Sequence, residues 1–258
     1  MKIAVPMVLC LLLFSCAIRQ EVTKEPVRRP EKEHQPLVER IGEYNNKLTS
    51  INATAIVVFR DIDNTLSLRC EVLARDGAEL LRLEFKDFVF KKPLATVVRN
   101  YGTVATYVHP TKECYQTAVE ETDFGSLLGF SIPVKLLFSS ILARVYIPEG
   151  EVVVEQIDDN NLLIEALQEQ EVVRFGQAAL PEEIAYAMTD SLGHTHMYRV
   201  SFETFEEKGS LVFPLVIKVT GQDRILEIRY SSVEPNAAIS EEQFITGSSD
   251  LEGCTRSN

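Results

Sequence analysis

Apolar and polar residues alternate with a period of two over much of this chain after residue 50. The segment LSLRCEV at residues 66–72, for example, places four apolar side chains on one face and three polar ones on the other. Such alternation predicts β-strands with one face buried and the other in solvent. Turn-forming pairs such as Asp76-Gly77 and Lys208-Gly209 separate the segments. We therefore predict one large antiparallel sheet with one wet and one apolar face.

About ten short strands follow from this pattern. The segments are residues 53–59, 66–72, 81–85, 94–99, 103–109, 152–157, 162–167, 196–205, 211–219 and 225–231. Two other segments have helical periodicity instead. They are marked by Leu37, Ile41, Tyr44 and Leu48, and by Val134, Leu137, Phe138, Ile141, Leu142 and Val145. The second helix lies between Pro133 and Pro148 in the nearly wholly apolar segment 124–146. It either packs simply on the sheet or forms a lid over a lipid-sized cavity.

The first residues of the chain predict export and lipid attachment. Lys2 precedes an apolar stretch of about 12 residues, which is shorter than the roughly 20 needed to span a bilayer as a helix and fits a signal peptide. The stretch ends in Leu13-Phe14-Ser15-Cys16, which resembles a bacterial lipobox. The resemblance implies that Cys16 is diacylated on sulfur, becomes the N-terminus and is then N-acylated. An ordinary signal peptide and an uncleaved anchor are the alternatives.

The domain organisation follows from these features. We expect a lipoprotein signal peptide at residues 1–15, then Cys16 and a flexible tether up to residue 36, because residues 17–36 are charged, proline-dotted and too polar to fold alone. Residues 37–246 form the domain, and residues 247–258 are a disordered tail. Ala17 is not the Asp that retains lipoproteins at the inner membrane in some bacteria. An outer-membrane, periplasm-facing location is therefore favoured, and an exported chain allows a disulfide between Cys70 and Cys114.

The charge balance excludes some partners. The chain has 26 basic and 38 acidic residues, which gives a formal net charge of −12. A nucleic-acid partner needs clustered Lys and Arg to neutralise its phosphates, so none is expected. Electrostatic binding of a Lys/Arg cluster to anionic lipid headgroups is equally disfavoured.

Two polar motifs are candidate sites of chemistry. The sequence VVFRDIDNTL at residues 57–66 resembles the first motif of haloacid-dehalogenase phosphatases, which implies a nucleophile at Asp61, an acid at Asp63 and a magnesium site. Strand alternation resumes at Leu66, however, whereas that fold needs α/β crossovers, so a hairpin turn is the favoured interpretation. His194 and His196 could place two imidazoles on one face of a strand to hold a metal ion. The sequence offers no third metal ligand at a recognisable spacing from them. We expect no catalytic residue, metal or other cofactor, and keep the phosphatase as a minor alternative.

A short apolar stretch lies between lysines. Phe88-Val89-Phe90 stands between Lys86-Asp87 and Lys91-Lys92. As a strand, it would place both phenylalanines on one face. As a connection between strands, it would expose an apolar loop ringed by lysines, suited to an acyl chain or a bilayer surface.

The order of these features resembles the LolA/LolB-like superfamily of lipoprotein carriers and receptors, and related uncharacterised outer-membrane lipoproteins. FPLVIKVTGQDRILEIRYSSVEPNAAISEEQFI at residues 213–245 is similar to that superfamily's C-terminal strands, with Pro214, Asn236 and Phe244 at its marked positions. LLGFSIPVKLLFSSIL at residues 127–142 is similar to its cavity-capping region. The resemblance implies an incomplete antiparallel barrel around an apolar cavity that accepts acyl chains. It also implies an apolar loop for membrane delivery, about where residues 88–90 fall.

The resulting prediction is a mainly β (α+β) fold, an incomplete β-barrel with an N-terminal helix and short lid helices. Its function would be to bind acyl chains or another amphiphile in lipoprotein or lipid localisation. Partners would be membrane lipid, lipoprotein acyl chains and a periplasmic carrier protein. The rival is a structural or interaction lipoprotein with a filled core. The predicted cavity lining is Leu68, Leu81, Leu83, Phe85, Leu137, Ile141, Val200, Phe202, Ile217 and Ile228.

Overall fold

A computed structural model describes most of the chain beyond residue 34. The described residues are 35–75, 79–119, 132–145, 147, 151–158, 160–166, 169–176, 180–189, 193–209, 211–221, 224–245 and 255–256. The predicted signal peptide, Cys16, the tether and Cys254 lie outside them. Of the tail predicted to be disordered, only Thr255 and Arg256 are described.

All described strands belong to one sheet of 14 strands, in the order β14-β6-β5-β4-β3-β2-β1-β13-β12-β11-β10-β9-β8-β7. The strands are β1 (Ser50–Arg60), β2 (Thr65–Arg75), β3 (Leu80–Asp87), β4 (Pro93–Asn100), β5 (Thr103–Val108), β6 (Glu113–Ala118), β7 (Val153–Gln156), β8 (Asn161–Glu165), β9 (Glu169–Phe175), β10 (Pro181–Thr189), β11 (Thr195–Lys208), β12 (Leu211–Gly221), β13 (Arg224–Pro235) and β14 (Thr255–Arg256).

The sheet consists of two antiparallel meanders joined in the middle. Strands β1–β6 form one meander and β7–β13 the other, and β1 pairs with β13 to join them. Only the short β14 is parallel to its neighbour, β6. The end strands β14 and β7 do not pair within the described residues, so the sheet is not closed. The predicted incomplete antiparallel barrel is confirmed.

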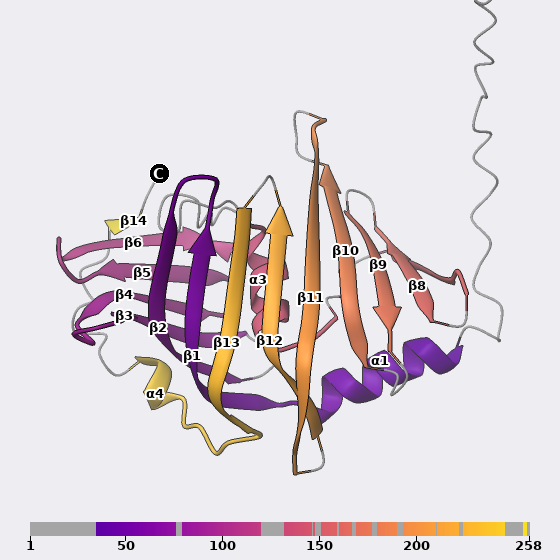
Figure 1. Ribbon diagram of the computed structural model, residues 1–258, viewed down its shortest axis with the longest axis horizontal. Coiled ribbons are helices and arrows are strands. Elements are labelled where there is room, and N and C mark those ends of the chain that lie inside the picture. The colour runs from indigo at the N-terminus through magenta and orange to yellow at the C-terminus, as the bar shows by residue number, and fades with distance from the viewer. Residues whose placement is uncertain are drawn as a thin grey trace, which may run out of the picture.

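The sheet curls strongly around helix α3 (Val134–Ile141). In Figure 1, β3–β6 cross behind β1, β2 and β13, and α3 lies inside the curl. The strands alternate as predicted: in β2, Leu68, Cys70 and Val72 are buried on the inner face while Glu71 is exposed. Most buried apolar side chains of both meanders form one continuous core. Each fully buried large apolar side chain contributes roughly 1.5–3 kcal/mol, so this core stabilises the open sheet.

The helices follow the predicted periodicity, with one difference. Helix α1 (Gln35–Lys47) buries Leu37 and Ile41, and Figure 1 places it across the lower ends of β9–β11. Helix α3 ends at Ile141 rather than continuing to Val145, because Ala143 adopts a left-handed backbone with φ of 53°. Helix α4 (Glu242–Ile245) follows the last long strand. No described helix is long and apolar enough to cross a membrane.

Three sequence interpretations need correction. The pair Cys70–Cys114 is wrong: Cys70 is a free, buried thiol, whereas Cys114 is disulfide-bonded. Residues 88–90 form the turn between β3 and β4, so the strand alternative for them is also wrong. Strands β6, β9 and β10 were not predicted as separate strands; in β10 the apolar positions alternate with alanines, which hides the period of two.

Candidate functional site

A wholly apolar cavity lies between α3 and the inner face of the curled sheet. The volume of this space is only about 20 Å³, which is room for about one water molecule. Leu137 and Ile141 of α3 therefore fill most of the space over the sheet. The lining residues are Val57, Phe59, Cys70, Val72, Leu83, Phe85, Leu137, Ile141, Leu226 and Ile228.

The predicted lining residues fall into two groups. The first group lines this cavity: Leu83, Phe85, Leu137, Ile141 and Ile228. The second group is buried in the same core but does not line it: Leu68, Leu81, Val200, Phe202 and Ile217. Sequence reasoning missed Val57, Phe59, Cys70, Val72 and Leu226. The alternation of apolar and polar residues in β1, β2 and β13 does predict that these five side chains are buried. It does not show which part of the inner face of the sheet α3 covers.

A buried hydrogen bond holds the C-terminal end of α3 against the sheet. The Tyr230 hydroxyl on β13 donates to the backbone carbonyl of Ile141 at 2.7 Å. The Phe213 ring packs edge-on to Tyr230, with centroids 5.5 Å apart. Burial raises the pKa of Tyr230 well above its usual range, so the phenol stays protonated and keeps its donor.

The segment after α3 is also tied to α1. The Arg144 guanidinium donates to the backbone carbonyls of Asn45 and Leu48, and the Asn45 side-chain amide donates to the Val145 carbonyl at 3.1 Å. Desolvation lowers the pKa of Arg144, but a guanidinium remains charged at any physiological pH. We call Tyr230, Asn45 and Arg144 the latch. Its members connect α3 and the residues that follow it to β13 and to the end of α1.

The latch includes buried polar atoms without hydrogen bonds. Within the described part of the chain, Asn45 Oδ1 and Arg144 Nε have no partner. Such atoms each cost about 1–3 kcal/mol when buried. The Arg99 guanidinium of β4 also lies 5.3 Å from the Phe138 ring centroid of α3. Helix α3 is thus held by a few polar contacts around an apolar centre.

The turn between β3 and β4 presents an apolar tip. Val89 and Phe90 are 71% and 76% exposed, and Phe88 is partly exposed. The Asp87 carboxylate accepts the backbone N–H groups of Val89 and Phe90 at 2.9 and 2.6 Å. An aspartate that receives two amide bonds fixes the backbone of the turn. Val89 and Phe90 project into solvent, whereas the Phe88 ring lies 5.6 Å from the Arg69 guanidinium of β2.

The turn between β1 and β2 adds a further exposed apolar side chain. Ile62 is 83% exposed. Leu68 of β2 pairs with Asp87 of β3, so the two turns lie at the same end of these neighbouring strands. Sequence reasoning missed Ile62, because a single apolar residue between two aspartates gives no periodic signal.

Asp61 and Asp63 belong to this same turn, as the favoured sequence interpretation had them. The Asp61 carboxylate accepts the backbone N–H groups of Asp63 and Asn64 at 2.9 and 2.7 Å. These backbone hydrogen bonds lower the pKa of Asp61. Its role in the structure is to hold a hairpin. His194 lies in the turn before β11, and the described residues contain no cluster of three His, Cys, Asp or Glu side chains arranged for a metal.

Comparison with known proteins identifies the fold. Neither a protein-family model nor a curated protein sequence matches this chain. Among solved structures, a LolA superfamily protein from Nitrosomonas europaea matches with a TM-score of 0.56 and 12% identity, covering 82% of this chain and 96% of that one. A Vibrio parahaemolyticus domain described as an outer-membrane lipoprotein-sorting protein matches at 0.56 and 10%, covering 84% and 98%. A DUF1329 family protein from Desulfovibrio piger matches at 0.59 and 10%, with the same coverage.

These matches agree with the resemblance seen in the sequence. At such low identity they establish the fold and nothing finer. The chain has the fold shared by LolA superfamily and lipoprotein-sorting structures, a half-open barrel with a helix inside its curl.

Proposed function

We propose that this protein is a lipid-anchored, non-enzymatic binding protein of the outer membrane that takes acyl chains or a similar amphiphile into the cavity under α3. The observation that carries the proposal is the lining of that cavity, which is apolar at every position. Acyl chains need apolar area and no catalytic group. The carrier-type fold supports the same assignment.

Helix α3 acts as the lid in this proposal. Ligand sites commonly have volumes of about 300–1,000 Å³, whereas this one holds about 20 Å³. The structure therefore corresponds to the closed state, and α3 moves outward when an acyl chain enters. Burying a dozen CH2 groups contributes about 10 kcal/mol, while each latch hydrogen bond contributes about 0.5–1.5 kcal/mol. Lid opening also exposes Leu137 and Ile141, which are buried in the closed state at about 1.5–3 kcal/mol each. An acyl chain that takes their place against the sheet offsets this loss and that of the latch hydrogen bonds.

The apolar tip is proposed as the membrane contact. Phe88, Val89 and Phe90 enter the edge of the bilayer, with Ile62 of the neighbouring turn beside them. Lys91 and Lys92 follow directly and are exposed, so their ammonium groups lie at the level of lipid headgroups. Cys16 carries the covalent acyl anchor, and the tether after it allows the domain to turn its tip toward a membrane or toward a periplasmic carrier.

The near-complete filling of the cavity favours one alternative, an interaction lipoprotein whose core never accepts a ligand. The free thiol of Cys70 can distinguish an acyl-binding protein from an interaction lipoprotein. It is buried and lines the cavity, so its reactivity reports whether the cavity opens and whether a ligand fills it. Burial raises its pKa, so the closed protein reacts slowly with maleimides. We expect alkylation at Cys70, located by peptide mass mapping, to accelerate in Tyr230→Phe and to be blocked by saturating palmitate.

The exposed substitution Tyr101→Phe is the matched control for the loss of a phenolic hydroxyl. It leaves the alkylation rate unchanged. If palmitate protects Cys70 in neither the parent protein nor Tyr230→Phe, the core is closed to ligands and the interaction lipoprotein is the correct assignment.

A further inference from the structure

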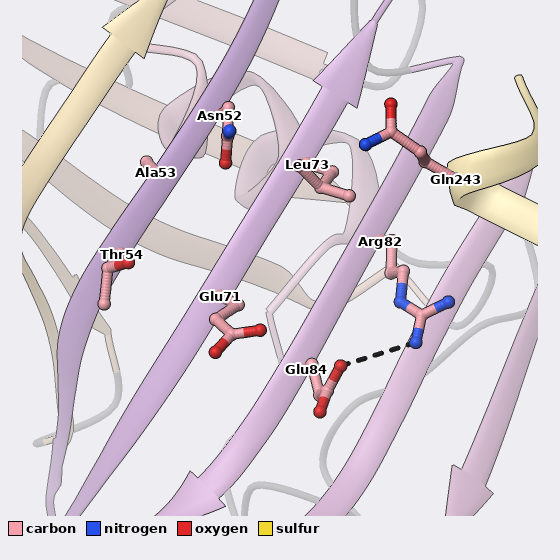
Figure 2. Close-up of a pocket in the computed structure, with 8 residues that line it drawn as sticks. All are labelled: Asn52, Ala53, Thr54, Glu71, Leu73, Arg82, Glu84 and Gln243. Carbon is pink, nitrogen blue, oxygen red and sulfur yellow. Dashed lines mark hydrogen bonds and ion pairs between the residues drawn. The ribbon is translucent and has the colours of Figure 1, made fainter. Parts of the chain in front are cut away.

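A second, polar pocket lies on the outer face of the sheet, behind the strands that line the apolar cavity. Its volume is about 360 Å³, within the range typical of small-molecule sites. Strands β1, β2 and β3 form its floor, and helix α4 contributes one wall (Figure 2). The lining residues are Asn52, Ala53, Thr54, Glu71, Leu73, Arg82, Glu84 and Gln243.

The strand register arranges these side chains in two rows. Asn52 pairs with Leu73, which pairs with Arg82. One step along, Thr54 pairs with Glu71, which pairs with Glu84. Figure 2 shows Leu73 among the polar groups, with the Gln243 amide extending from α4 toward Leu73 and the Arg82 guanidinium turned toward Glu84. A small apolar surface is therefore surrounded by amide, hydroxyl, carboxylate and guanidinium groups.

The charges of the pocket are compensated within the sheet. Glu71 and Glu84 lie directly opposite one another, where two like charges repel. Lys86 Nζ lies 2.6 Å from Glu71 Oε1 and 3.2 Å from Glu84 Oε1, and Arg82 Nη2 lies 3.4 Å from Glu84 Oε2. A charged ligand would have to compete with these ion pairs. A neutral ligand keeps them and still finds carboxylate acceptors.

The neutral polar groups have hydrogen-bonding capacity to spare. Within the described residues, the Asn52 amide and the Thr54 hydroxyl make no hydrogen bond, and Gln243 uses only its Oε1, which accepts the Ser240 N–H at 2.8 Å. Gln243 is held in place because its neighbour Phe244 is buried against Leu80 and Ile239. Packing thus positions this wall of the pocket, and within the described residues the Gln243 NH2 group makes no hydrogen bond.

We propose that this pocket binds one neutral saccharide ring. A sugar ring has an apolar C–H face that would lie on Leu73, and hydroxyls around its edge. Each hydroxyl both donates and accepts, so it matches amides, carboxylates and a guanidinium alike. The site faces away from the apolar cavity, and the inference stands independently of the function proposed for that cavity.

The test is saturation-transfer NMR on the full-length protein in a zwitterionic, sugar-free detergent. The probes are glucose, N-acetylglucosamine and, as a small comparison that carries both an ammonium and a carboxylate, glycine. We expect saturation transfer to the ring C–H protons of at least one sugar and none to glycine. Asn52→Ala and Gln243→Ala each weaken binding by about tenfold, the effect of one or two lost hydrogen bonds. Glu207→Gln, at an exposed position of β11, leaves it unchanged.

Three outcomes overturn the proposal: no transfer to either sugar, transfer that persists equally in both pocket variants, or transfer to glycine in preference to the sugars. Both substituted side chains are exposed, and thermal unfolding of each variant at the parental temperature shows that lost transfer is not lost fold.

Discussion

The Tyr230 hydroxyl and the Ile141 carbonyl, 89 residues apart in sequence, form a buried 2.7 Å hydrogen bond that joins the sheet to the last residue of α3. It ties the C-terminal end of α3 to β13, while the Arg99 guanidinium of β4 contacts the Phe138 ring of the same helix. Replacing Tyr230 by Phe keeps the ring against Phe213 but leaves the carbonyl unsatisfied. We expect a loss of about 1–3 kcal/mol in the free energy of unfolding, measured in urea.

The matched control for that variant is Tyr101→Phe, which removes an exposed hydroxyl and is expected to change the free energy of unfolding by less than about 0.5 kcal/mol. Equal values for the two variants would contradict the structural role of the Tyr230–Ile141 bond.

Arg144 should control how often the lid opens. Arg144→Met keeps the stem of the side chain but removes both hydrogen bonds to the end of α1. We expect amide hydrogen exchange to accelerate over residues 134–145, by about tenfold or more for the loss of a charged hydrogen bond. Exchange over β11, which the latch does not touch, should stay the same. Unchanged exchange in α3 would show that Arg144 does not hold it.

The sequence predicted the architecture because one repeated signal encodes it. The alternation in β2 specifies which face of that strand is buried, and the same holds for β3 and β13. It does not specify how far the sheet curls or how its two meanders join, because the pairing of β1 with β13 depends on residues that are far apart in the chain. The pattern therefore predicts burial for both Leu68 and Leu83, yet of these two only Leu83 lines the cavity under α3.

The sequence predicted an apolar space under a helix, but neither the end of that helix nor the volume of the space. Helix periodicity identified α3, but its end depends on the left-handed backbone at Ala143, which no residue preference announces. The cavity volume depends on how closely Leu137 and Ile141 pack, which a pattern of apolar residues does not contain. The polar pocket was missed because its residues come from three strands and a helix more than 150 residues later.

A buried carboxyl should make stability depend on pH. Glu171 on β9 is fully buried between Ile164 of β8 and Tyr186 of β10, and its oxygens have no hydrogen-bond partner in the described structure. Burial, and secondarily the nearby Glu169, raises the pKa of Glu171 well above 4.5. Between the unfolded and folded pKa values the folded state binds more protons. The free energy of unfolding therefore falls as pH rises above about 4.5.

Glu171→Gln removes this titration while keeping the shape of the side chain. Urea unfolding from pH 5 to 9 should show a smaller decline for this variant than for the parent, so that it becomes relatively more stable at high pH. The exposed substitution Glu182→Gln is the control. Parallel curves for Glu171→Gln and the parent would rule out the buried carboxyl as a source of the pH dependence.

The absence of tryptophan makes the apolar tip easy to probe. Phe90→Trp places the sole tryptophan on the tip, and its emission should shift to the blue when phospholipid vesicles are added. Phe205→Trp, on the partly exposed face of β11, should not shift. Brominated lipids should quench the first variant only. Equal responses of the two tryptophans would refute a specific membrane contact at residues 88–90.

The central claim is that the space under α3 accepts an acyl chain, and native mass spectrometry of the purified protein with added palmitate tests it most directly. We predict a peak with one bound palmitate. The peak should vanish in Val72→Phe, which fills the cavity from β2, and persist in Val212→Phe, a substitution at a half-buried position of β12 outside the lining. A parent protein that stays free of palmitate, or a palmitate adduct that persists in Val72→Phe, would contradict the account.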